Sequence, residues 1–219
     1  MKLHELADAK AVAREAATRI AAADAAAGKR FAICLSGGST PQTMYGILAS
    51  DEFASRLHWD RWHVFFGDER QVPLGDERSN YGNARRELLD RVPIPHGQIH
   101  PLTDADQYEG LLRSFFGDRC DFDVLLLGMG DDGHTASLFP GSVALLEDER
   151  WVIAPPDVVE GMARYTLTLP ALKAARQTYF LVSGAAKHDA LERVRAGEAL
   201  PSGMLPDADW LVDSAAVAG

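Results

Sequence analysis

The sequence is poor in cysteine and has no long apolar run. Of the two cysteines, Cys34 lies in an apolar stretch and Cys120 follows a predicted helix, so neither belongs to a metal-ligand pattern or a disulfide framework. No apolar run approaches the length of a membrane span, and the first ten residues lack the apolar core of a signal peptide. We therefore expect a cytoplasmic protein with two structural thiols, no membrane association and no metal site.

Basic residues are also scarce relative to acidic ones. The chain has 22 Lys and Arg against 32 Asp and Glu, which gives a formal net charge of −10. The overall field therefore opposes docking on nucleic acid or on an anionic membrane. We expect a small-molecule partner, and an anionic substrate would need a local cationic pocket.

The length and the hydrophobic pattern indicate one α/β domain over residues 1–219. Strands and helices alternate along the chain, which predicts a doubly wound, mainly parallel sheet with helices on both faces. The expected strands cover residues 31–35, 62–66, 124–127, 151–154, 165–169, 179–182 and 210–212. The expected helices cover residues 5–27, 51–57, 81–91, 105–116 and 171–176, with others following Thr40 and Gly184.

The stretch FDVLLLGMGDDGHTASLFPG contains the first candidate site. Val124 to Leu127 are all apolar, as in a central parallel strand, and a glycine-rich turn follows where α/β sheets place their ligand crevices. The turn carries Asp131, Asp132 and His134, so it offers an imidazole beside carboxylates for proton transfer. The alternative is an ordinary glycine turn with a surface histidine.

We also expect residues 134–138 to form a short helix before Pro140. His134 would then lie near the helix N-terminus. The helix dipole would disfavour the imidazolium and keep the base neutral near pH 7.

A second candidate site follows the strand at residues 31–35, in the run SGGSTP. Gly37 and Gly38 allow close backbone approach, and Ser39 and Thr40 offer hydroxyls. With Thr40 as cap and Pro41 at the first helical position, the free amides of the helix start would attract an anion such as phosphate. The loop lacks the Walker lysine and the dinucleotide-binding spacing, so an ordinary capped turn remains the alternative.

Charged residues also follow the strand at residues 62–66. Asp68, Glu69 and Arg70 come at its carboxyl end, which again points to the crevice, although such a cluster is also common in solvated loops. Arg164 and Lys187 taken alone would be assigned to the surface.

Together these motifs resemble one enzyme family. The runs SGGSTP, FFGDERQVPLGDERSNYGNARRELL, LLLGMGDDGHTASLFPG and ARYTLTLPALKAARQTYFLVSGAAKHDAL are similar to those of the 6-phosphogluconolactonases, in order from about Phe31 to Lys187. The resemblance implies the α/β sheet fold shared with glucosamine-6-phosphate deaminase and ribose-5-phosphate isomerase. It also implies hydrolysis of 6-phospho-D-glucono-1,5-lactone in the oxidative pentose phosphate pathway, without a cofactor.

The resemblance also assigns roles to residues. It implies that His134 is the general base, with Asp132 as the carboxylate beside it and Arg70 as an active-site cation. It implies that Gly37, Gly38, Ser39 and Thr40 bind the sugar phosphate, and that Arg164 and Lys187 add positive charge. The segment VVEGMARYT departs from the family pattern, which has a proline closer to the arginine. A monomer or weak homo-oligomer is expected.

Two alternatives keep the fold. A sugar-phosphate isomerase or deaminase would need different acid-base groups, and the deaminase pattern has a glutamate where this chain has Phe139 and a tyrosine where it has Arg70. A non-catalytic sugar-phosphate sensor is the other alternative. A regulator of that kind normally carries a DNA-binding module, for which this acidic chain has no room.

Overall fold

Two β-sheets form the framework of the computed structural model, which describes residues 1–219. Six parallel strands pair in the order β1-β9-β8-β5-β2-β3, and three short antiparallel strands pair in the order β4-β7-β6. The predicted doubly wound, mainly parallel sheet is confirmed. The strands are β1 (Lys2–Leu6), β2 (Phe31–Leu35), β3 (Trp62–Phe66), β4 (Asp68–Arg70), β5 (Val124–Leu127), β6 (Val152–Ile153), β7 (Arg164–Leu167), β8 (Thr178–Val182) and β9 (Asp209–Asp213).

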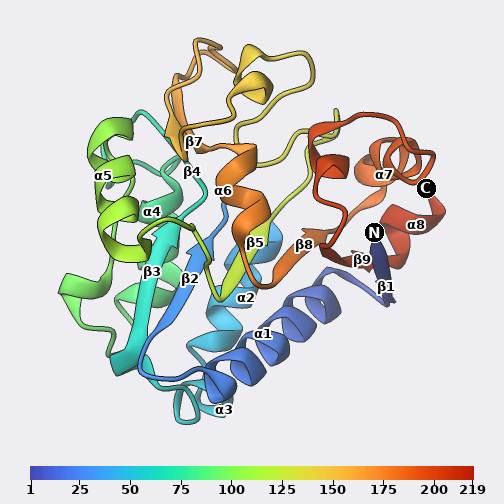
Figure 1. The fold of residues 1–219 in the computed structure, drawn as a ribbon. Helices are drawn as coiled ribbons and strands as arrows, with labels where there is room; N and C mark the ends of the chain where they lie inside the picture. The colour runs from blue at the N-terminus through green and yellow to red at the C-terminus, as the bar shows by residue number, and fades with distance from the viewer.

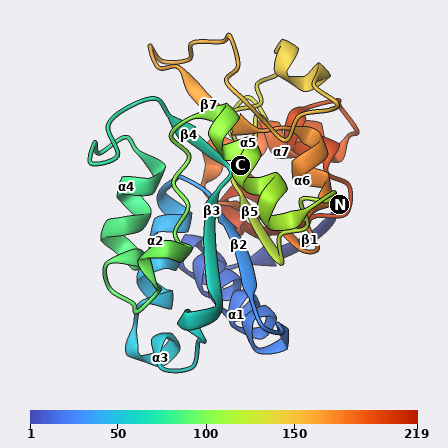
Figure 2. The same cartoon turned by 60° about the vertical axis from the view of Figure 1, so that its left-hand side comes forward.

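Helices cover both faces of the larger sheet. The helices are α1 (Ala9–Ala26), α2 (Ser39–Leu48), α3 (Asp51–Ala54), α4 (Asn80–Ala84), α5 (Ala105–Phe116), α6 (Leu169–Ala174), α7 (His188–Arg195) and α8 (Ser214–Ala218). Helices α1 and α2 pack together on one face, and α5 and α6 lie on the other (Figures 1 and 2). Every residue of β2 and β5 is buried, as their apolar sequences predict. No helix combines the length and hydrophobicity that a membrane span requires.

The chain changes direction across the sheet between β2 and β5. From β2 it crosses through α2 to β3 on one side, whereas from β5 it proceeds to β8 on the other side. The connections that follow these adjacent parallel strands therefore diverge and leave a crevice at their carboxyl ends. The smaller sheet lies beyond those ends, at the top of Figure 1.

The N-terminal prediction was wrong in part. Residues 5–27 do not form one helix, because Lys2–Leu6 form β1 and α1 begins at Ala9. The Asp8 side chain caps α1 by accepting a hydrogen bond from the Ala11 amide at 2.8 Å. Strand β1 depends on pairing with β9 at the far end of the chain, and no local pattern reports such pairing.

The DER run also differs from the sequence expectation. Asp68–Arg70 form the strand β4 rather than a loop, and Arg70 pairs in register with Arg164 on β7. Other boundaries differ less. The helix predicted at 81–91 begins at Asn80 and changes to a π-helical turn over Arg85–Leu89, and β6 covers only two of the four residues predicted.

A buried tyrosine on α5 holds the end of β3 that leads into the crevice. The Tyr108 side chain is 3% exposed, and its hydroxyl accepts a hydrogen bond from the Phe66 amide at 2.8 Å. This contact satisfies a buried backbone donor at the last residue of β3. It therefore helps to fix where β4 begins.

We predict that Tyr108→Phe lowers the free energy of unfolding by about 1–3 kcal/mol, because the buried Phe66 amide loses its acceptor. Tyr165→Phe is the matched control, since Tyr165 is half-buried and its hydroxyl makes no hydrogen bond within the protein. Urea titrations followed by circular dichroism measure both. Equal midpoints for the two variants would contradict the prediction.

Candidate active site

A cavity of about 240 Å³ opens at the crevice between β2 and β5. Its walls come from the segments that follow β2, β5 and β8, together with β4 and β7. All of the site residues predicted from the sequence line it except Asp132: Gly37, Gly38, Ser39, Thr40, Arg70, His134, Arg164 and Lys187. Segments that are far apart in the sequence thus meet around one space.

His134 and Asp132 form a hydrogen-bonded pair at the end of β5. The Nδ1 atom of His134 lies 2.6 Å from Oδ1 of Asp132, and the His134 amide donates to the same oxygen at 3.0 Å. A carboxylate only accepts, so Nδ1 carries the proton and Nε2 keeps its lone pair. The His134 side chain is 32% exposed, so water can reach that lone pair.

The environment of Asp132 favours its charged form. Partial burial pushes its pKa upward, but the hydrogen bonds from the backbone and the ring of His134 lower it more, so the net pKa is below the usual value. Asp132 therefore stays ionised near neutral pH. It fixes the ring tautomer of His134.

Gly130 makes room for this pair. A Cβ atom at position 130 would lie 2.0 Å from Nδ1 of His134 and 2.7 Å from Oδ1 of Asp132. The Gly130 amide also donates to the His134 carbonyl at 2.9 Å, which closes the turn. Only glycine allows the backbone this close to the imidazole.

The short helix predicted at residues 134–138 is absent. Thr135 and Leu138 instead form an isolated bridge, and Ala136 has a φ of 48°. Thr135 is held by its hydroxyl, which donates to the Gly128 carbonyl at 2.9 Å. Ser137 is held by distant residues, since its amide donates to the Thr166 hydroxyl and its own hydroxyl donates to Asp68. These tertiary contacts override the local helical pattern, so Asp132 rather than a helix dipole acts on the imidazole.

The glycine loop leads into α2 two residues earlier than predicted. Gly38 is the N-cap with a φ of 106°, so Thr40 and Pro41 lie inside the first turn and the predicted cap at Thr40 was wrong. No side chain caps this helix start. The amides of Ser39 and Thr40 are thus left for another acceptor, and an anion suits them.

Asn80 is a site residue that the sequence reasoning missed. Its buried Oδ1 accepts from Nη1 of Arg70 at 2.9 Å, and its Nδ2 donates to the Asp68 carbonyl and carboxylate at 2.9 and 3.0 Å. A Cβ atom on Gly37 would lie 2.1 Å from that Oδ1. Asn80 therefore fills the space between the glycine loop and Arg70. The run Ser79-Asn80-Tyr81 was part of the family resemblance, but its local pattern does not show that the Asn80 side chain points into the site.

Asp68 extends this contact to the histidine loop. Its second carboxylate oxygen accepts a hydrogen bond from the Ser137 hydroxyl at 2.7 Å, and both side chains are buried. The glycine loop, β4 and the turn after β5 are thus joined by one set of polar side chains. The sequence analysis placed Asp68 near the crevice without assigning it a role, and it did not single out Ser137.

Arg70 and Arg164 are paired in register on the adjacent strands β4 and β7 of the smaller sheet. Arg164 is 5% exposed, and the Nε atoms of Arg164 and Arg70 are buried without a hydrogen-bond partner. Burial and the nearby Arg70 charge lower the pKa of Arg164, against an opposing effect of Asp68 and Glu160. Adjacent cations with unused donors are suited to an anion such as phosphate.

Lys187 lies at the rim of the same cavity. Its Nζ atom pairs with Oδ1 of Asp131, and its side chain is 27% exposed. The pair places a third cation near the glycine loop. Asp131, the carboxylate that pairs with Lys187, lies in the same turn as His134.

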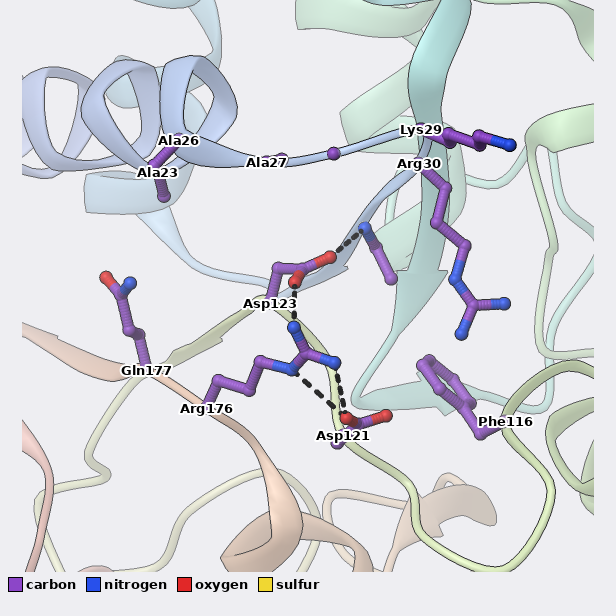
Figure 3. Close-up of a pocket in the computed structure, with 12 residues that line it drawn as sticks. Ala23, Ala26, Ala27, Lys29, Arg30, Phe116, Asp121, Asp123, Arg176 and Gln177 are labelled. Atoms are coloured by element: carbon purple, nitrogen blue, oxygen red, sulfur yellow. Dashed lines mark hydrogen bonds and ion pairs between the residues drawn. The ribbon is translucent and has the colours of Figure 1, made fainter.

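A larger cavity, of about 480 Å³, lies at the opposite end of the sheet (Figure 3). Arg176 there bridges Asp121 and Asp123, and Arg30 lies over the Phe115 ring at 4.4 Å. Arg176 and the two aspartates therefore offset one another's charge, and no histidine, cysteine or serine lines the space. The smaller cavity is therefore the better candidate, although it has the smaller volume.

The protein has no group of three or more His, Cys, Asp or Glu side chains close enough to hold a metal ion. Cys34 and Cys120 are both free and buried. They are not exposed for reaction or ligation, which agrees with a structural role.

Comparison with known proteins gives consistent results. The chain is 43% identical over 196 residues to the 6-phosphogluconolactonase of Synechocystis sp., covering 84% of this chain and 79% of that protein. It is 40% identical over 194 residues to the Mycobacterium tuberculosis 6-phosphogluconolactonase, covering 81% and 77% of the two chains.

Solved structures of related proteins have the same fold as this chain. The 6-phosphogluconolactonase from Thermotoga maritima superposes with a TM-score of 0.84 at 28% identity, over 97% of this chain and 99% of that one. A monomeric glucosamine-6-phosphate deaminase shares the fold, with a TM-score of 0.84 at 20% identity over 100% of this chain and 99% of that one. The family model for glucosamine-6-phosphate isomerases/6-phosphogluconolactonase matches residues 6–212, and the chain therefore belongs to that family.

Proposed function

We propose that this enzyme hydrolyses 6-phospho-D-glucono-1,5-lactone to 6-phospho-D-gluconate, with His134 as the base that activates water. The observation that carries the proposal is that His134 and the anion-binding groups line one cavity. The named relatives are 6-phosphogluconolactonases, which supports this substrate. The reaction belongs to the oxidative pentose phosphate pathway and uses no redox cofactor.

The free Nε2 lone pair of His134 takes a proton from water as the water oxygen bonds to the lactone carbonyl carbon. The carbonyl oxygen becomes the tetrahedral oxyanion. When the oxyanion collapses, the bond between that carbon and the ring oxygen breaks, and the ring oxygen takes the proton back from the imidazolium. Asp132 keeps its charge throughout and stabilises the imidazolium, to which it is hydrogen-bonded at Nδ1.

The oxyanion needs hydrogen-bond donors within the cavity. The candidates are the guanidinium of Arg70 and those backbone amides of the turn at residues 128–133 that do not already donate within it, as Gly130 and Gly133 do. A donor of this kind contributes roughly 3–4 kcal/mol in the transition state. Asn80 holds Arg70 in place for this role.

The phosphate group of the substrate binds at the other side of the cavity. The amides of Ser39 and Thr40, the Gly37-Gly38 backbone, Arg164 and Lys187 form its site. Binding energy from this remote group holds the lactone carbonyl beside the water. Arg164 and Lys187 also supply the local positive charge that an acidic protein needs in order to bind an anion.

The deaminase alternative lacks a residue that the family resemblance requires. Phe139 occupies the position of the deaminase glutamate, and its ring lies 4.5 Å from the His134 ring. An apolar ring cannot transfer a proton there. A lactonase assay, timed against spontaneous hydrolysis of the substrate, separates the lactonase from a sensor and from a deaminase, since neither of these would hydrolyse the lactone.

We predict that His134→Gln lowers kcat by about 10²- to 10⁴-fold and leaves KM nearly unchanged, because it removes the base but not the phosphate site. His96→Gln, at an exposed position outside the cavity, is the control. A spectrophotometric lactonase assay gives both constants. Unchanged turnover in the His134 variant would exclude the role as base.

We further predict that Arg164→Ala chiefly raises KM, because Arg164 contacts the phosphate and not the reacting carbon. Arg164→Lys retains a charge for the case in which the alanine variant does not fold, and it should raise KM less. Circular dichroism checks folding. Normal saturation by the lactone in both variants would argue against phosphate binding at Arg164.

A further inference from the structure

The loop between β6 and β7 ends in a tight turn beside Arg164, at the top of Figure 1. Val159 and Met162 exchange two backbone hydrogen bonds, at 3.2 and 3.1 Å, around Glu160 and Gly161. Both enclosed residues have positive φ, 54° and 73°. Turns of this kind favour Asn-Gly or Asp-Gly, and glutamate is a poor first residue for them. The turn itself therefore does not explain Glu160.

The charge of Arg164 explains better why a glutamate stands at position 160. The Glu160 carboxylate lies 3.6 Å from Nη2 of Arg164, which is the one ion pair that Arg164 makes. The buried Asp68 also offsets the Arg164 charge, but its two oxygens accept hydrogen bonds from Asn80 and Ser137, so Asp68 is held in place and cannot move away from Arg164. Glu160 is thus the free carboxylate that faces this buried cation.

The two partners differ sharply in exposure. The Arg164 side chain is 7% exposed and the Glu160 side chain is 77% exposed. Glutamate reaches in from solvent and can return to it without losing another contact. Arg164 is fixed in β7 and lines the cavity.

We propose that Glu160 is a displaceable counter-ion that competes with the phosphate of the substrate for Arg164. This inference rests on the proposed function, in which Arg164 binds that phosphate. When the phosphate arrives, the Glu160 carboxylate swings into water, because two anions at one guanidinium repel each other. The turn thus lowers the affinity of the site for phosphorylated ligands, substrate and product alike, and speeds product release.

The test is Glu160→Gln, which removes the charge and keeps the size of the side chain and the turn. We expect the Kd for 6-phosphogluconate, measured by titration calorimetry, and the KM for the lactone to fall together by about 2- to 10-fold. Glu149→Gln is the matched control, since it makes the same charge change at an exposed residue whose carboxylate forms no ion pair. It should leave both constants unchanged.

Arg164→Lys separates this inference from the proposed function. If Arg164→Lys weakens 6-phosphogluconate binding but Glu160→Gln leaves it unchanged or weaker, the counter-ion role is wrong and the phosphate site stands. If neither Arg164→Lys nor Arg164→Ala weakens binding, the phosphate assignment itself fails. Combined with Arg164→Lys, the Glu160→Gln change should have a smaller effect than in the wild-type background, because the two residues act on each other.

Discussion

The site depends on the divergence of two neighbouring parallel strands. The chain leaves β2 and β5 in opposite directions, so the glycine loop and the histidine turn border one crevice. Divergence alone does not fix the positions of the loops that border the crevice. Asn80 and Asp68 fix it, because their buried side chains join the glycine loop, Arg70 and the turn that carries His134. The polar atoms of both side chains have hydrogen-bond partners, which favours one arrangement of the crevice.

Charge is distributed in the protein in a way that suits an anionic ligand. The chain carries a net charge of −10, yet Arg70 and Arg164 are paired in register on adjacent strands with unused Nε donors. Placing two guanidinium groups together is unfavourable unless an anion offsets them. In our account, phosphate does so during catalysis and Glu160 does so in part when the site is empty.

Local patterns predicted much of the fold and the segments of the site. Apolar runs such as Val124–Leu127 and the glycine turns after them were visible because they depend on neighbouring residues only. Strands β1 and β4 were missed because each depends on a partner distant in the chain. Asn80 was missed for a related reason, since the inward direction of a side chain is a tertiary property. The absent helix at 134–138 shows tertiary hydrogen bonds overriding local propensity.

The most direct test of the central claim is a crystal structure of the enzyme with 6-phosphogluconate bound. We predict that the phosphate lies against the amides of Ser39 and Thr40 and the guanidinium of Arg164, and that the carboxylate carbon of the product lies beside Nε2 of His134. A phosphate bound elsewhere, for instance near Arg30 in the cavity of Figure 3, or a product carboxylate remote from His134, would contradict the account.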